Sequence, residues 1–380
     1  MSGCSAVPYR GRGGTARSTR ERGWWASRYV TLRFAPPRAL AAPRSHQRWP
    51  PAAPRPYIRA VTTPSALSPV PDGVLRGLHV VSLALNLPGP AALMRLAEMG
   101  AICCKVEPPS HDGAPGDPMA SYAPSAYAAM HHGVARHDLD LKDDAGRQAL
   151  YALLQDADVL ITSFRPSALQ RLGVHPDMLG GRFPRLSLVM IVGEHGAEAE
   201  HPGHDLTYEA SAGLLGDLAL PAAPFADMAG ALLVVEAVFR AVLRRQRDAA
   251  AMIVEEVALA DAARFLALPR AWGLMQATSP IGGGHAGYQV YACRGGRVAV
   301  AALEPRLAQA LCRATGLPAV QATRLHEAVA FGHLAAFFAD RSCAEVQSLV
   351  AAHDLPAVVM ADPLPTASRP DAVGAAVRLN

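Results

Sequence analysis

Apolar residues in the first half of the chain fall into short continuous runs that begin after Gly73. Runs of this kind at Leu78–Leu85, Ala101–Val106, Val159–Thr162 and Arg185–Val192 predict buried strands. Helical periodicity lies between them, at residues 90–99, 143–156 and 167–172. Strands that are apolar throughout and alternate with helices are typical of a parallel sheet covered on both faces. The pattern therefore predicts an α/β fold with a Rossmann-like parallel sheet.

The pattern changes after Ala210, where long helical segments predominate. Beyond a run of glycines at 282–284, two strand-like runs flank Arg294-Gly295-Gly296 and predict a hairpin. Helical segments at 306–315 and 343–352 follow, and a strand-like run at 357–360. We expect a large domain over residues 73–280, a smaller α+β domain over residues 281–355, and a return of residues 356–380 to the large domain.

The turn after the first predicted strand tests whether such a sheet binds a dinucleotide. A dinucleotide site needs GxGxxG there, so that the pyrophosphate can approach the start of the next helix. The turn reads Asn86-Leu87-Pro88-Gly89-Pro90, which has one glycine and loses an amide donor at Pro90. The sequence of this turn therefore argues against binding of NAD or FAD.

Positive charge is concentrated in the first 72 residues, which hold twelve Arg, eleven Pro and only two acids. The net charge of +4 therefore reflects this segment, and the rest of the chain is acidic. We expect residues 1–72 to be a disordered tail that can be removed without loss of the fold. A transit peptide, a nucleic-acid arm and a start codon assigned too far upstream remain open for it. The charge of the folded part does not favour nucleic-acid binding.

Cysteine spacing and hydropathy argue against a disulfide-rich, a metal-binding and a membrane-spanning protein. The six Cys form no CxxC pair, and no His cluster has the spacing of metal ligands, so we expect no metal and a reducing, cytoplasmic location. No apolar run is long enough to span a membrane. The best candidate, Ala229–Leu243, contains Glu236 and Arg240 and predicts a buried helix.

Several segments together resemble the family III CoA-transferases, over residues 74 to 360. Each motif alone is weak, but they occur in the family's order. They are Leu75–Val81 with Pro88-Gly89-Pro90, Leu96–Ala101, Lys105–Pro109, Leu139-Asp140-Leu141-Lys142, Ala157–Leu160, Phe164–Pro166, Leu172-Gly173 and Phe183–Leu186. The resemblance implies the fold of that family: a large Rossmann-like CoA-binding domain, a smaller α+β domain and an interlocked homodimer.

Three further segments resemble the 2-methylacyl-CoA racemase branch of the family. Gly203–Tyr208 is similar to its "GHDINY", Phe225–Gly230 to its "LADFAGG" and Ala302–Pro305 to its "AIEP". The resemblance implies that His204 and Asp227 are the two bases and that Glu304 supports His204.

This pair of residue types suits inversion at a carbon next to a thioester carbonyl. A proton must leave one face and return on the other, which a neutral imidazole and a carboxylic acid can do. The enolate between the two steps needs hydrogen-bond donors at its oxygen. Backbone amides beside Asp205 are candidates, because we expect Asp205 to be the N-cap of a helix.

The resemblance also implies where the CoA thioester substrate binds. The expected residues are Leu139, Asp140, Leu141, Lys142, Gly203, Tyr208 and Lys105. No permanently bound cofactor is expected, and the expected partners are the acyl-CoA substrate and a second copy of the chain, with no nucleic acid and no membrane.

Two other functions stay open. In a family III CoA-transferase, which moves CoA between carboxylic acids, an Asp at the position of Asp205 attacks the thioester and forms an acyl-enzyme. The adjacent His204 favours the racemase. A divergent non-catalytic homologue that only binds or scaffolds is favoured by lost basic positions. Pro108 stands where racemases carry Arg, and Val134-Ala135 where the family usually carries Lys-Arg.

Overall fold

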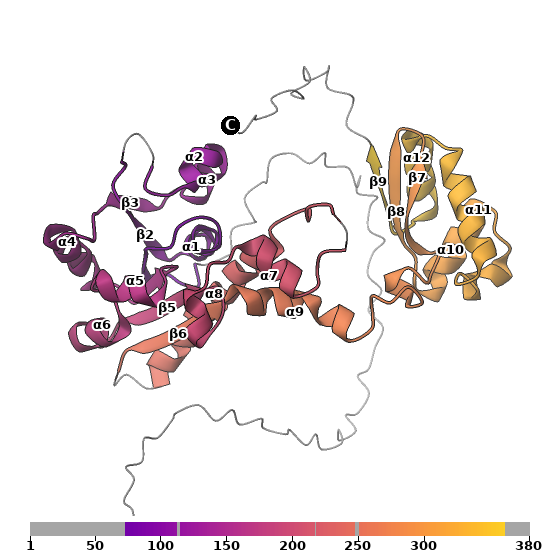
Figure 1. The fold of residues 1–380 in the computed structure, drawn as a ribbon. Coiled ribbons are helices and arrows are strands. Elements are labelled where there is room, and N and C mark those ends of the chain that lie inside the picture. The colour runs from indigo at the N-terminus through magenta and orange to yellow at the C-terminus, as the bar shows by residue number, and fades with distance from the viewer. Residues whose placement is uncertain (1–72, 112–114, 217, 248–250, 362–380) are drawn as a thin grey trace, which may run out of the picture. The chain divides into compact units, whose positions relative to one another are not determined.

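The computed structural model describes residues 73–111, 115–216, 218–247 and 251–361 (Figure 1). The predicted tail, residues 1–72, lies outside the described residues, as do residues 362–380.

A six-stranded parallel sheet forms the first part of the described chain, with strand order β3-β2-β1-β4-β5-β6 (Figure 1). Its strands are β1 (His79–Ser82), β2 (Ile102–Glu107), β3 (Ala135–Asp138), β4 (Val159–Thr162), β5 (Ser187–Val192) and β6 (Ile253–Ala258). The predicted α/β class is therefore confirmed. The two edge strands, β3 and β6, were not predicted from the sequence.

Helices cover both faces of this sheet. They are α1 (Pro88–Glu98), α2 (Met119–Tyr122), α3 (Pro124–Met130), α4 (Asp144–Leu154), α5 (Pro166–Arg171), α6 (Pro176–Arg182), α7 (Asp205–Ser211), α8 (Phe225–Arg247) and α9 (Leu259–Ala271). Val159 and Ile161 of β4 pack with α1 and α8, whereas Leu160 between them packs with α4, α5 and α6. Because neighbouring side chains of a strand point to opposite faces, both faces need apolar residues, and this produces the continuous runs in the sequence.

Local sequence determines where several of these helices begin and end. Pro88 occupies the first turn of α1, where its missing amide hydrogen leaves no helix bond unmade. Gly100 follows the end of α1 with a φ of +95°, in the left-handed region that glycine adopts readily. Asp143 caps α4 by accepting a 2.6 Å hydrogen bond from the amide of Gly146.

A three-stranded antiparallel sheet forms the last part, with strand order β7-β8-β9. β7 (Tyr288–Cys293) and β8 (Gly296–Ala301) form the predicted hairpin, which turns at Gly295 with a φ of +79°. Three helices pack with this sheet: α10 (Pro305–Thr315), α11 (Ala328–Ala339) and α12 (Cys343–His353).

Residues 356–380 were expected to return to the large domain, but those of them that the structure describes remain with the smaller sheet. β9 (Ala357–Ala361) pairs with β8 and so belongs to the smaller sheet. The reason is that β8 has β7 along only one edge, and β9 satisfies the backbone groups of its other edge.

Within the described ranges, no helix is both long and apolar enough to cross a membrane.

Candidate active site

A cavity of about 160 Å³ lies beyond the carboxyl ends of β1, β4 and β5. The strand order reverses between β1 and β4, since β2 and β3 continue on one side and β5 and β6 on the other. Open parallel sheets bind ligands at such a switch point, because the two following loops turn to opposite faces and leave a crevice. The polar lining comprises Asn86, Ser163, Arg165, His201, His204 and Asp227.

The turn between β1 and α1 forms one wall of the cavity and is held by side chains from elsewhere. The amide of Leu85 donates to Oγ of Ser163 over 3.1 Å, and the amide of Asn86 donates to Oδ1 of Asp117 over 3.1 Å. Asn86 has a φ of +65°, which is uncommon for a residue other than glycine. The contact with Asp117 fixes this unusual conformation where the chain enters α1.

His204 stands at the N-cap of α7 and lines the cavity. Its amide donates to Oγ1 of Thr207 over 3.1 Å, which fixes the backbone at the start of the helix. Gly203 is needed for packing as well, since a Cβ there would lie 2.4 Å from the hydroxyl oxygen of Tyr208. The predicted residues Gly203, His204 and Tyr208 therefore meet in one wall of the cavity.

Asp205 differs from the expectation that it would be an N-cap. It is the first residue of α7, while His204 is the N-cap, and its carboxylate faces the start of another helix. Oδ1 of Asp205 accepts a 2.9 Å hydrogen bond from the amide of Asp227, in the first turn of α8. The first turn of a helix has unpaired amides, so a nearby carboxylate is stabilised there.

Asp227 contributes a carboxyl group with a strongly raised pKa to the cavity lining. Burial raises its pKa to about 7, and the neighbouring carboxyls of Asp205 and Glu209 contribute in the same direction. Both protonation states of Asp227 are thus populated near neutral pH. A group of this kind can donate and accept a proton under those conditions.

Glu209 belongs to the same cluster and was missed in the sequence. Its side chain is completely buried in α7, and Oε1 accepts a 2.7 Å hydrogen bond from the amide of Phe225. Burial raises the pKa of Glu209, and so does the neighbouring Asp205 carboxyl. The spacing of four residues between Asp205 and Glu209 could have revealed it, because it places two acids on one helix face.

Glu304 lies in the part of the chain that holds the smaller sheet. It occupies the N-cap position of α10, directly before Pro305. It is not among the residues that line the cavity. Its support of His204 stays a prediction.

The predicted CoA-binding segment 139–142 is an ordered turn between β3 and α4. Leu141 is buried in the core, whereas Lys142 is exposed. The amide of Lys142 donates to Oδ1 of Asp140 over 2.9 Å, and the Arg147 guanidinium donates to the carbonyls of Leu141 and Lys142. Of this segment, Lys142 therefore presents a cation to solvent, while the side chain of Leu141 serves the core.

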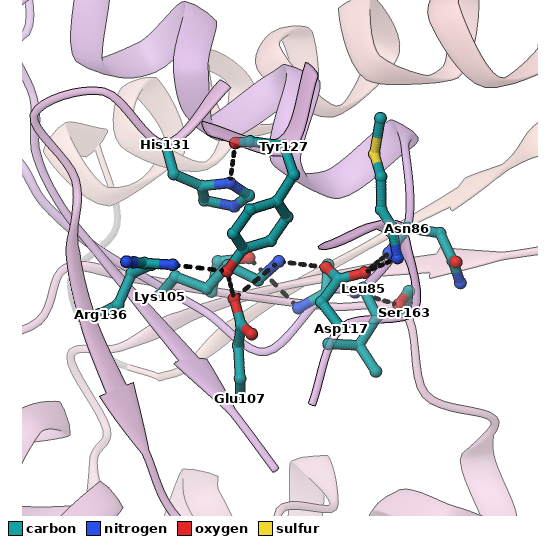
Figure 2. Close-up of polar contacts among 12 residues, drawn as sticks. Leu85, Asn86, Lys105, Glu107, Asp117, Tyr127, His131, Arg136 and Ser163 are labelled. Atoms are coloured by element: carbon teal, nitrogen blue, oxygen red, sulfur yellow. Dashed lines mark hydrogen bonds and ion pairs between the residues drawn. The ribbon is translucent and has the colours of Figure 1, made fainter. Parts of the chain in front are cut away.

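Lys105 has a setting that the sequence did not suggest. It is completely buried, and its Nζ lies 2.5 Å from Oδ2 of Asp117 and 3.4 Å from Oε1 of Glu107 (Figure 2). Tyr127 donates its hydroxyl hydrogen to Glu107 and accepts a 3.2 Å hydrogen bond from Arg136. The ammonium is thus bound by two carboxylates inside the protein, and this geometry gives no support to a direct contact with CoA.

The buried network around Lys105 reaches the cavity through Asp117. One carboxylate oxygen of Asp117 binds Lys105, and the other accepts from the amides of Asn86 and Met119 (Figure 2). Asp117 was not singled out in the sequence, because it lies outside every predicted element. Its role is to hold the cavity-lining turn at Asn86 against the sheet.

Among the residues with a described placement, no group of three or more His, Cys, Asp or Glu side chains has an arrangement that could hold a metal ion.

Comparison with known proteins identifies a family model that covers most of the chain. The model of CoA-transferase family III matches residues 75–373. A protein of Mycobacterium tuberculosis named as a probable fatty acyl-CoA transferase is 31% identical over 210 residues, which cover 51% of this chain and 52% of that protein. The human alpha-methylacyl-CoA racemase is 28% identical over 262 residues, which cover 64% of this chain and 65% of the racemase.

Further relatives include CoA-transferases. The acetyl-CoA:oxalate CoA-transferase of Acetobacter aceti is 31% identical over 180 residues, covering 45% of this chain and 44% of that enzyme. The matched segments thus span less than two thirds of the length of these relatives. Among solved structures, one of a Mycobacterium tuberculosis protein has a TM-score of 0.62 at 26% identity and covers 75% of this chain and 83% of its own.

Proposed function

The chain belongs to CoA-transferase family III, and on that premise we propose that it inverts the configuration at C2 of a 2-methylacyl-CoA. The observation that carries the proposal is the presence of His204 and Asp227 in the lining of one cavity. The raised pKa of Asp227, to about 7, gives that residue a proton to donate near neutral pH.

In the proposed reaction His204, as a neutral imidazole, removes the proton from C2. The electron pair moves to the thioester oxygen and forms an enolate. Asp227 then returns a proton to the opposite face of C2, and the reverse reaction exchanges the two roles. Arg165 also lines the cavity and supplies positive charge that would stabilise the enolate.

The test is incubation with (R)-2-methylacyl-CoA in deuterated water. A racemase incorporates deuterium at C2 and produces both configurations. Absence of exchange, together with movement of CoA to an added carboxylic acid, would replace the proposal by CoA transfer.

CoA transfer is the second candidate, and the transferases among the relatives favour it. The Asp205 carboxylate would attack the thioester carbonyl, release CoA thiolate and form an acyl-aspartyl anhydride. An incoming carboxylate would attack the Asp205 carbonyl of this anhydride, release the first acid and form a new anhydride. The CoA thiolate would then attack the new acyl carbonyl, which forms the new thioester and frees the Asp205 carboxylate. One oxygen of Asp205 already accepts from the Asp227 amide. This reaction would therefore use the other oxygen.

A divergent non-catalytic homologue that only binds or scaffolds is the third candidate. Lys105 was expected to bind CoA, and its burial between two carboxylates supports this candidate because it removes one cation from the CoA site. A thermal-shift titration with CoA separates it from the first two candidates, since both enzymes must bind CoA.

We further propose that the chain assembles as an interlocked homodimer. Large apolar side chains on α8 and α9 support this, since Leu232 is 64% exposed, Phe265 66% and Trp272 65%, the last directly after α9. Exposed apolar patches often mark interfaces. Light scattering at micromolar concentration tests it, and a monomeric mass would contradict it.

A further inference from the structure

Glu209 is a buried acid that the proposed reaction does not use. It is 0% exposed, and an ionised carboxylate in such a place is costly unless it is paired with a cation. Among the described ion pairs, none involves Glu209. Its Oε2 is buried and meets no N–H or O–H donor in the described part of the chain, and the Glu209 carboxyl is hydrogen-bonded to the carboxyl of Asp205. A proton shared among the carboxyls of Asp205, Glu209 and Asp227 would lower the free-energy cost of burying them.

Two hydrogen bonds join acids of α7 to the first turn of α8, which carries Asp227. Oε1 of Glu209 accepts from the amide of Phe225 over 2.7 Å, and Oδ1 of Asp205 accepts from the amide of Asp227 over 2.9 Å. Both acids come from α7, and both amides belong to the first turn of α8. The two acids of α7 therefore clamp the turn that presents Asp227 to the cavity.

The three carboxyls are close enough to affect one another's ionisation. Asp205 and Glu209 both raise the pKa of Asp227, and Asp205 raises that of Glu209. Adjacent carboxyls with no cation between them cannot all ionise at low cost, so they retain protons at a higher pH. The other titratable groups around Asp227 are Tyr122, Tyr208 and His204, with Arg165 and Glu194 near Tyr208.

We propose that Glu209 is a positioning residue that anchors the first turn of α8 and, through its buried carboxyl, keeps Asp227 protonated as the acid of the cavity. The inference rests on the function proposed above. It extends that function by placing a third carboxyl behind the catalytic pair. Glu209 does not contact the substrate in this arrangement, because it is completely buried.

The test compares Glu209→Gln with the parent protein. Gln keeps an oxygen that accepts from the Phe225 amide but removes the negative charge, so α8 should keep its start. The expected result is that Asp227 titrates ~1 pH unit lower in the variant. The titration is followed by ¹³C NMR of labelled Asp carboxyls, and the Asp227 signal is assigned from its absence in Asp227→Asn. The alkaline limb of the kcat/KM profile should move down by the same amount. Glu209→Asp, which keeps the charge, should restore the parent midpoint.

Glu236→Gln is the matched control, since Glu236 is an exposed acid of α8 that pairs with Arg240. It should leave both the titration and the profile unchanged. An Asp227 midpoint that is the same in Glu209→Gln and the parent would overturn the inference. The NMR titration needs no turnover, so a parent protein without racemase activity would refute the proposed function alone. If Glu209→Gln fails to fold, Glu209→Asp and the parent's own Glu209 titration decide. A Glu209 midpoint above that of Asp227 would overturn the inference, because Glu209 would then carry no charge while Asp227 titrates.

Discussion

The backbone amide of Asp227 donates a hydrogen bond to Oδ1 of Asp205 over 2.9 Å, so the two acids that compete for a catalytic role are fixed to each other. One is the proposed acid of a racemase, and the other is the nucleophile of the transferase alternative. A substitution at Asp205 therefore affects both hypotheses, and its effect depends on whether an acceptor for the amide remains.

Asp205→Asn separates the two functions. Asn keeps a side-chain oxygen for the Asp227 amide but cannot form an acyl-enzyme. A racemase should keep most of its activity, while a transferase should lose all turnover. Asp205→Ala also removes the acceptor and should weaken a racemase further, since a hydrogen bond contributes ~0.5–1.5 kcal/mol. Loss of all activity in Asp205→Asn, with an acyl group on Asp205 trapped by hydroxylamine in the parent, would replace the racemase by the transferase.

His204→Ala and Asp227→Asn should each abolish inversion but leave exchange from one face. With one base removed, the remaining group can still take and return the C2 proton on its own side. Each variant should lose roughly 10²–10⁴-fold in inversion. Deuterium exchange, measured separately with (R)- and (S)-substrate by mass spectrometry, should show opposite preferences in the two variants. Equal exchange of both substrates in either variant would contradict the two-base reaction.

Asp227→Asn should also change how stability depends on pH. The carboxyl has a pKa of about 7 in the folded protein, against ~3.9 in an unfolded chain. The folded state therefore binds more protons between these values, and stability falls as the pH rises from about 4 to about 7. Asn removes this fall. The Tm of the variant relative to the parent should be higher at pH 8 than at pH 5, by ~2–4 °C per kcal/mol relieved. A constant difference would show that Asp227 titrates normally.

Lys105→Met should destabilise the fold strongly, because it leaves Asp117 and Glu107 buried without their cation. Removing one partner of a buried ion pair costs ~3–5 kcal/mol. Lys142→Met is the control, since Lys142 is exposed, and surface changes usually stay within ~0.5 kcal/mol. Urea unfolding of both variants measures the difference. If the two variants unfolded at the same urea concentration, the network around Lys105 would contribute nothing to stability.

The sequence by itself determined the central strands and several helices. Val159–Thr162 was predicted with the bounds that β4 has, because a strand buried on both faces must be apolar throughout. The edge strands give no such signal: β3 is exposed along its length, and β6 contains Glu255 and Glu256. Their pairing depends on neighbours that are distant in the chain.

Some residues of the candidate site were likewise predicted from the sequence, and others were found only in the tertiary structure. Local motifs identified His204, Asp205 and Asp227, but only the structure brings His204 and Asp227 into the lining of one cavity. Nothing local indicated Asp117, and the four-residue spacing from Asp205 to Glu209 gives no sign that Glu209 is buried. The burial of a charged side chain depends on which segments pack over it, and the strand order β3-β2-β1-β4-β5-β6 decides that. Only the tertiary structure therefore places Lys105 between two carboxylates. It also places Glu209 behind Asp227, where burial raises the pKa of both acids.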